Sequence, residues 1–279
     1  DNAGLYAKYL LGIKNDLPVA LAAPSMFSMY QSPPKLESSL VLAISQSGQS
    51  PDILQVVEEG NRQGAMTLAI TNAPNSPLAS AASHTIDIRA GIEKAVAATK
   101  TYTSQLLSIA MLSAALRDDQ RMFLELKQVP DLVSNALDQE PVIQQASKRY
   151  YYAQQCVVVG RGYNYANAFE WALKLKELTY MVAEPYSSAD FLHGPIAMVE
   201  PGFPVFILAP SGRVQQDLYE LIVKLKKEKR ANLLIVSDDT TVLEFSQTPI
   251  QLTEMPEWLS PIVSVVPGQL FCLALAQLR

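Results

Sequence analysis

The segment LVLAISQSGQSPDILQVVEEGNRQGAMTLAI, residues 40–70, decides the fold. It begins with a short apolar run rich in branched residues, 40–44, and ends with a similar run, 66–70. Between the two runs, residues 52–63 place apolar side chains at helical spacing. Each run ends at turn or cap residues, so the order is strand, helix, strand. Two strands joined by one helix pair in parallel, which predicts an α/β fold.

The same alternation continues along the chain and then begins again. The other segments that we expect to be regular are a strand at 85–88, a helix at 99–117, a strand at 156–159, a helix at 165–181, a strand at 205–209, a helix at 214–229 and a strand at 232–236. We therefore predict two tandem lobes, 1–118 and 151–279, each a parallel sheet with helices on both faces. The polar, amphipathic stretch 119–150 is expected to form a helical connection.

Composition narrows the class of protein. Of the 279 residues, 49% are hydrophobic and 18% are charged, the profile of a soluble globular protein. The net charge of -5 argues against nucleic acid as a partner. Cys156 and Cys272 lie in apolar stretches and are expected to be buried hydrophobic residues. The two histidines, His84 and His193, belong to no Cys/His cluster, so we expect no metal site, and no other cofactor is indicated.

The pattern of apolar residues also bears on location. The longest apolar segment, 262–278, is interrupted by Pro267, Gly268 and Gln269, so we expect no membrane span. The chain starts without Met and without a basic segment followed by an apolar core, so we expect no export signal. A cytoplasmic location is the resulting expectation.

A polar loop, SQSGQS at 45–50, follows the first strand and leads into the first helix. Ser50 and Pro51 are residue types favoured at the N-cap and first helical position. Gly48 allows a sharp turn and a close approach of the backbone to a ligand. Three hydroxyls, an amide and the N–H groups of a helix start are suitable for binding phosphate. The spacing alone favours an ordinary capped turn over a phosphate site, and both interpretations stay open at this point.

Two further motifs contain ionisable groups. In the helix over 165–181, Glu170, Lys174 and Glu177 lie along one stripe, which by itself favours solvent-exposed ion pairs. The adjacent stripe is expected to be buried and consists of Trp171, Leu175, Leu178 and Val182. His193 follows an apolar run and precedes Gly194-Pro195, which suits an acid–base group near neutral pH, although a lone histidine is more often structural. Residues 160–162, Gly-Arg-Gly, are interpreted mainly as a tight turn.

Taken in order, these motifs resemble the sugar isomerase (SIS) domain family. The likeness is to the double-SIS form, found in the isomerase half of glucosamine-6-phosphate synthase and in stand-alone glucosamine-6-phosphate deaminases. It covers nearly the whole chain, and its strongest parts are 45–50, 95–100, 160–162, 172–177 and 193–195. The resemblance implies two flavodoxin-like αβα sandwiches and an enzyme that acts on a hexose or hexosamine 6-phosphate.

The resemblance also assigns roles. The residues that it implies for binding the sugar phosphate are Ser45, Gln46, Ser47 and Ser50. Val96 would contact the sugar near C2 through its backbone, and Glu177 would move a proton between C1 and C2. Lys174 would be the charge partner of Glu177. His193 would open the sugar ring and, in this family, comes from the neighbouring subunit, so a homodimer is implied.

Three departures from the synthase pattern bear on the reaction. The synthase pattern contains one strand and one phosphate-binding serine before the position of Asp1, and a tail with a substrate-facing lysine after that of Arg279. We expect these parts to lie outside residues 1–279. The loop ends in Ser-Pro-Asp, 50–52, where the synthase has a different sequence, and this ending looks more like the stand-alone deaminases. Deamination of glucosamine-6-phosphate to fructose-6-phosphate and ammonia is therefore the first hypothesis. The alternatives are the isomerase half of a glutamine–fructose-6-phosphate aminotransferase, a non-catalytic phosphosugar sensor, and plain aldose–ketose isomerisation.

Overall fold

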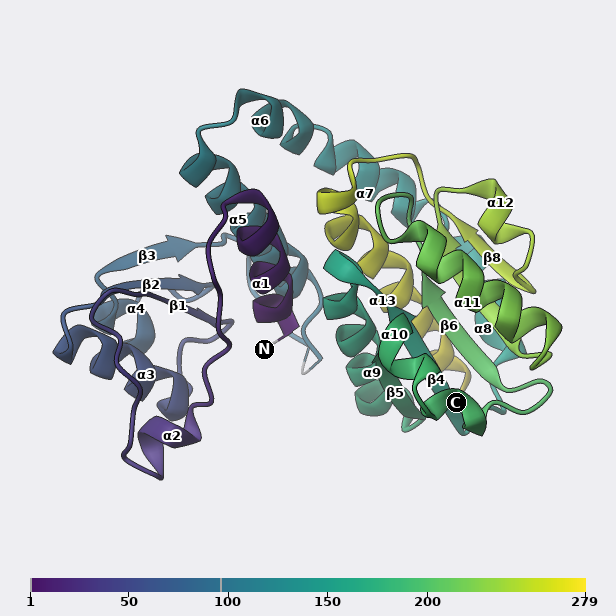
Figure 1. Ribbon diagram of the computed structural model, residues 1–279, viewed down its shortest axis with the longest axis horizontal. Helices are drawn as coiled ribbons and strands as arrows, with labels where there is room; N and C mark the ends of the chain where they lie inside the picture. Colours follow the sequence, from purple (N-terminus) through teal and green to yellow (C-terminus); the bar gives the residue numbers. More distant parts are fainter. Residues whose placement is uncertain (1, 96) are drawn as a thin grey trace.

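The computed structural model describes residues 2–95 and 97–279 and contains two parallel β-sheets flanked by helices (Figure 1). The first sheet has the strand order β1-β2-β3, and the second has the order β5-β4-β6-β7-β8. All of the strand pairs described are parallel. Renumbered within its lobe, the second sheet has the order 2-1-3-4-5, which is the flavodoxin-like arrangement. The predicted α/β fold with two parallel-sheet lobes is confirmed.

The first lobe is built on the segment that the sequence singled out. Its elements are β1 (Leu40–Ser45), α3 (Pro51–Arg62), β2 (Met66–Thr71), α4 (Pro77–Ala81), β3 (His84–Asp87), α5 (Lys100–Arg117), and the short α2 (Ser25–Ser28). Val41 and Ala43 of β1 are buried in one core with Val57 of α3. Ile44 is instead buried in a second core with Leu106 of α5. Alternate residues of one strand therefore bury against helices on opposite faces of the sheet.

The second lobe surrounds an aromatic cluster. Its elements are β4 (Gln155–Gly160), η1 (Gly162–Asn164), α9 (Tyr165–Thr179), β5 (Val182–Ser187), α10 (Ser188–Leu192), η2 (Pro195–Met198), β6 (Pro204–Leu208), α11 (Gln215–Lys227), β7 (Asn232–Ser237), α12 (Thr240–Leu243), β8 (Thr248–Gln251), η3 (Glu257–Leu259) and α13 (Ser260–Leu278). Phe206 of β6 stacks on Trp171 of α9, with ring centroids 5.3 Å apart. Phe271 of α13 meets Phe206 edge to face at 5.2 Å. These ring contacts fasten α9 and α13 to one face of the sheet.

Helix α13 continues through Pro267 without a break. Gly268 lies directly against the indole of Trp171, and a Cβ at this position would be 3.0 Å from the ring. Among the described residues, 257–278 form a helix long and apolar enough to cross a membrane by length and composition alone. However, 78% of its apolar window is buried inside the protein, as in a core helix. Packing against the sheet therefore accounts for the apolar character of α13.

The connection between the lobes forms three short helices. They are α6 (Gln120–Leu126), α7 (Val129–Leu137) and α8 (Glu140–Arg149). Both α7 and α8 pack against α13. The predicted helical character of this stretch is confirmed, and the domain boundaries at 118 and 150 stay predictions.

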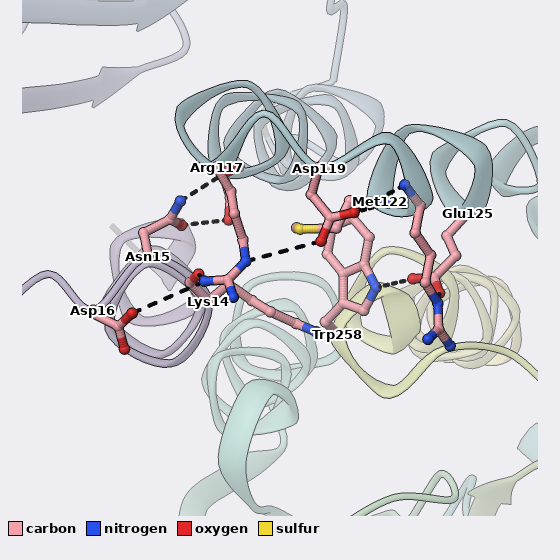
Figure 2. A network of polar contacts seen from close by, with 10 residues as sticks. Lys14, Asn15, Asp16, Arg117, Asp119, Met122, Glu125 and Trp258 are labelled. Carbon is pink, nitrogen blue, oxygen red and sulfur yellow. Dashed lines mark hydrogen bonds and ion pairs between the residues drawn. The ribbon is translucent and has the colours of Figure 1, made fainter.

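Helix α1 (Asn2–Lys14) lies between the lobes, where it packs against α5 and α9 (Figure 1). Figure 2 shows the polar network at its C-terminal end. Arg117 of α5 donates a hydrogen bond to the carbonyl of Lys14. The indole Nε1 of Trp258 in the second lobe donates to Glu125 Oε2 of α6 at 2.6 Å. Lys14 Nζ also lies 5.8 Å above the centre of the Trp258 ring. The network thus joins α1, α5, α6 and the second lobe, and helps to fix how the two lobes face each other.

Two strands were missed by sequence reasoning, β5 and β8. Both lie at the edges of the second sheet. Each contains a proline, Pro185 in β5 and Pro249 in β8, and neither forms an apolar run. A proline is tolerated on an edge strand because one side of that strand makes no ladder hydrogen bonds. The signal that identifies buried strands is therefore absent from both.

Candidate functional site

The loop 45–50 lies at the carboxyl end of β1 and is held by its own hydroxyl groups. Ser45, which is buried, accepts a hydrogen bond at Oγ from Gly48 N at 3.1 Å. Ser47 Oγ accepts from Gln49 N at 3.3 Å. In both cases the serine oxygen is an acceptor, so its own proton is left to donate elsewhere. A group rich in acceptor oxygens, such as phosphate, is the natural complement of such a loop.

The backbone of this loop requires glycine at one position. Gly48 has φ 61°, and a Cβ there would lie 2.0 Å from Ser76 Oγ of the neighbouring loop. Ser50 is the N-cap of α3 and Pro51 is in its first turn, as predicted. The Ser50 side chain makes no capping hydrogen bond, so its hydroxyl is not used by the helix. The start of α3 therefore adds a third hydroxyl to those of Ser45 and Ser47.

A chain of hydrogen bonds runs from this loop towards the second lobe. Asn72, just after β2, donates from its backbone N to the carbonyl of Gln46 at 3.1 Å. The Asn72 side chain bonds the next loop twice, donating to Gly91 O at 2.7 Å and accepting from Ala90 N at 3.0 Å. The Ser-rich loop and the 89–99 segment are thereby held together. Sequence reasoning identified Asn72 only as a turn residue.

The segment 89–99 is fastened at its other end by a carboxylate. Glu93 Oε2 accepts hydrogen bonds from Thr99 N at 3.3 Å and from Thr101 Oγ1 at 3.2 Å, at the start of α5. Gln269 of α13 donates to the carbonyl of Thr99 at 3.2 Å. A carboxylate is favourable at a helix N-terminus. The predicted sugar-contacting residue, Val96, falls in this segment but lies outside the described residues.

The acidic and basic residues of α9 form a compact cluster. Lys174 Nζ lies 2.8 Å from Glu177 Oε2 and 3.4 Å from Glu170 Oε1. The side chains of Lys174 and Glu170 are each 6% exposed, whereas that of Glu177 is 41% exposed. Asn2 of α1 donates to Glu170 Oε2 at 2.7 Å. The expectation of solvated ion pairs is wrong for Glu170 and Lys174, because α1 covers this part of α9.

The cluster keeps Lys174 charged. Burial by itself lowers the pKa of this lysine, but Glu170 and Glu177 outweigh burial and raise the pKa above its usual value of 10.5. Glu177 is the member of the cluster that solvent or a ligand can reach. The arrangement provides an accessible carboxylate next to an amine that is protonated at neutral pH, with a buried second carboxylate beside it.

The predicted buried stripe of α9 is confirmed only in part. Trp171 and Leu175 are buried, whereas Leu178 is partly exposed. Val182 is 57% exposed and begins β5, because the helix ends at Thr179.

His193 follows α10 and is exposed. Its backbone N donates to Asp190 O at 3.2 Å, and its imidazole bonds no other described residue. Within residues 2–95 and 97–279, no hydrogen bond or ion pair joins His193, the 45–50 loop and the α9 cluster to one another. The structure therefore brings Lys174 and Glu177 together on α9, and it holds the serines of the 45–50 loop close to one another. Within the described part of the chain, His193 is bonded to neither group.

Comparison with known proteins identifies the family. The model of the SIS domain matches residues 2–115 and 150–279. The chain belongs to the SIS domain family. The SIS family thus accounts for both lobes, and the resemblance inferred from the motifs is confirmed. Its homologues and structural neighbours include aminotransferases and a glucosamine-6-phosphate deaminase.

Three relatives illustrate the range. A glutamine–fructose-6-phosphate aminotransferase (isomerizing) of Thermus thermophilus is 36% identical over 290 residues, covering 99% of this SIS chain and 47% of its own. The solved C-terminal domain of glucosamine-fructose-6-phosphate aminotransferase from Francisella tularensis has a TM-score of 0.92 at 28% identity, covering 99% of this chain and 81% of that one. A glucosamine-6-phosphate deaminase from Thermotoga maritima has a TM-score of 0.80 at 22% identity, covering 99% and 82%, which shows the shared fold alone. This SIS chain spans about half the length of the curated relatives that it matches.

Proposed function

We propose that this protein moves a proton between C1 and C2 of a hexosamine 6-phosphate, and that its reaction is the deamination of glucosamine-6-phosphate to fructose-6-phosphate and ammonia. The observation that carries the proposal is the α9 cluster. Glu177 is accessible, and its partner Lys174 is buried, protonated and 2.8 Å away. A non-catalytic sensor would need only the phosphate loop and would gain nothing from burying this pair, so the cluster favours an enzyme.

Substrate binding is assigned to the first lobe. The sugar phosphate would accept hydrogen bonds from the hydroxyls of Ser45, Ser47 and Ser50 and from the amide of Gln46, and Val96 would contact the sugar through its backbone. Support comes from the free hydroxyl protons of the loop and from the glycine turn beneath it. Binding at the phosphate end of the substrate would hold the reacting carbons in place for the second lobe.

Catalysis is assigned to the second lobe. With the ring open, C2 of the substrate lies next to a carbonyl or imine, so its proton can be removed, and Glu177 would carry it between C2 and C1. The enediol or enolamine that forms carries negative charge, which the ammonium of Lys174 would stabilise. His193 would open the ring. Because its imidazole is exposed and has no partner among the described residues, we propose that it acts in the neighbouring subunit of a homodimer.

One experiment tests the assigned base. A Glu177→Gln variant should bind glucosamine-6-phosphate with nearly unchanged affinity and lose at least about 100-fold in kcat, because only proton transfer is removed. The matched control is Glu58→Gln, which changes an exposed carboxylate of α3 in the first lobe and should keep wild-type kcat. Unchanged turnover in Glu177→Gln would refute the assignment.

A second candidate function is the isomerase half of an aminotransferase. It is favoured by the 36% identity to the Thermus thermophilus enzyme. Two rates separate the candidates: ammonia release from glucosamine-6-phosphate, and glucosamine-6-phosphate formation from fructose-6-phosphate and ammonia. A faster first reaction supports the deaminase, and a faster second reaction supports the aminotransferase half. A full-length sequence with an upstream glutaminase domain and an N-terminal cysteine nucleophile would exclude the stand-alone deaminase. Isomerisation of neutral sugar phosphates without ammonia release would instead indicate a plain aldose–ketose isomerase.

We also propose a cytoplasmic location. Cys156 and Cys272 are both free and buried, and burial raises the pKa of each thiol. Free, unpaired cysteines are usual in a reducing compartment.

A further inference from the structure

A shallow cavity of about 360 Å³, largely open to solvent, lies at the amino-terminal ends of β6, β7 and β8 in the second lobe. Arg149 contributes from the last residue of α8 and Tyr152 from the segment that follows it. Arg230 contributes from the turn before β7, and Asn232 from the first residue of β7. The three strands are neighbours in the sheet (Figure 1). The proposed substrate site uses the carboxyl end of β1 in the first lobe and Glu177 of α9, and neither of these lines the cavity, so the cavity is separate from that site. Its volume is in the range that small molecules occupy.

The cavity is positively charged. It is lined by two arginines and by no carboxylate. Neither Arg149 nor Arg230 forms an ion pair with any residue in the described part of the chain. Arg149 makes one hydrogen bond, to Gln247 O at 3.4 Å. Two guanidinium groups thus line one hollow without a carboxylate partner, in a chain of net charge -5.

The backbone at Arg230 provides independent evidence. Arg230 has φ 54°, a left-handed conformation just after a helix, where glycine is the usual residue. The first lobe contains the equivalent turn. There, Gly64 with φ 76° precedes β2 by two residues, as Arg230 precedes β7. Both strands have the same parallel pairing with the preceding strand, so the two turns are structural counterparts. The second lobe therefore has an arginine at a left-handed position that its counterpart fills with glycine, so the backbone itself does not require the arginine side chain.

We propose that this cavity binds a phosphate-bearing small molecule. Arginine presents several N–H groups in a planar fork that matches phosphate oxygens, and two arginines line this cavity. Asn232 uses its Oδ1 to accept a hydrogen bond from Tyr150 OH at 3.2 Å, which leaves its amide N–H groups to donate. These N–H groups would be free to donate hydrogen bonds to an anionic ligand, which is rich in acceptor oxygens. A ligand here would act on an element of the second lobe and would be an effector, not a substrate.

The test is a calorimetric titration with inorganic pyrophosphate in the Ser47→Ala background, which weakens any contribution from the 45–50 loop. The reference protein should bind one pyrophosphate, and binding should weaken as salt is added. Arg230→Gly should weaken binding at least about tenfold, because charge-assisted hydrogen bonds are lost. Its Tm without ligand should not fall, since glycine suits φ 54°. Arg149→Gln should weaken binding to a similar extent.

The control is Arg121→Gln, matched to Arg149→Gln, which replaces another exposed helical arginine, on α6, that does not line the cavity. It removes the same charge, and it should leave pyrophosphate affinity unchanged. Equal loss of affinity in Arg121→Gln and Arg149→Gln would mean that net charge alone is measured, and would overturn the proposal. Unchanged affinity in Arg230→Gly, or no pyrophosphate binding at all, would overturn it as well.

Discussion

Replacing Lys174 by Met tests the buried cluster of α9 most directly. The change removes the ammonium that lies 2.8 Å from Glu177 and 3.4 Å from Glu170. Glu177 can turn to water, but Glu170 is only 6% exposed and would retain a single partner, Asn2. Removing one partner of a buried ion pair costs about 3 to 5 kcal/mol. We expect the free energy of unfolding of Lys174→Met to fall within this range.

The assay is urea denaturation followed by the fluorescence of the two tryptophans, of which one lies on α9 itself. Two controls isolate the buried charge. Lys176→Met changes an exposed lysine of the same helix and should cost less than about 0.5 kcal/mol. The double variant Glu170→Gln/Lys174→Met removes both buried charges and should recover most of the loss. A loss below about 1 kcal/mol in Lys174→Met, or no recovery in the double variant, would refute the reasoning.

The pH dependence of the same variant gives a sign test. The carboxylates raise the pKa of folded Lys174 above 10.5 despite its burial, so folding favours the protonated amine. The stabilisation is then fully present below the unfolded pKa of 10.5 and is lost as the pH rises through the folded value. The stability deficit of Lys174→Met should therefore stay constant from about pH 7 to about pH 9 and shrink only at higher pH. A deficit that grows with alkalinity would contradict the direction of the shift.

Three other substitutions test packing and backbone. Gly48→Ala should lower the Tm and weaken phosphosugar binding, because the new Cβ would lie 2.0 Å from Ser76 Oγ and the backbone there has φ 61°. Adding Ser76→Ala to this variant should restore part of the stability. Trp258→Phe should cost about 1.5 to 3 kcal/mol in urea denaturation by removing the 2.6 Å bond to the Glu125 carboxylate (Figure 2), and a neutral effect would mean that this bond is unimportant. Gly268→Val should lower the Tm by overpacking against the indole beneath it, whereas a rise would show a void there.

The sequence alone predicted the elements whose residues form local patterns. The buried strands are apolar runs, and α3 begins at Ser50 and Pro51, as helix-start preferences predict. Order and spacing of the motifs were enough to identify the SIS family before any coordinates. The edge strands β5 and β8 were missed because a half-paired strand tolerates proline and polar residues, so its sequence lacks the pattern of a core strand.

What only the tertiary structure decided is the environment of each ionisable group. The sequence spacing of Glu170, Lys174 and Glu177 placed them on one side of a helix. Glu170 and Lys174 are buried because α1, which is more than 150 residues away in sequence, packs against this part of α9. The Asn72 side chain likewise joins two loops that are 19 residues apart along the chain. Helix and strand signals are local because backbone hydrogen bonds and side-chain periodicity act over a few residues. Burial, and with it the pKa of Lys174 and the exposure of Glu177, depends on which distant elements pack together.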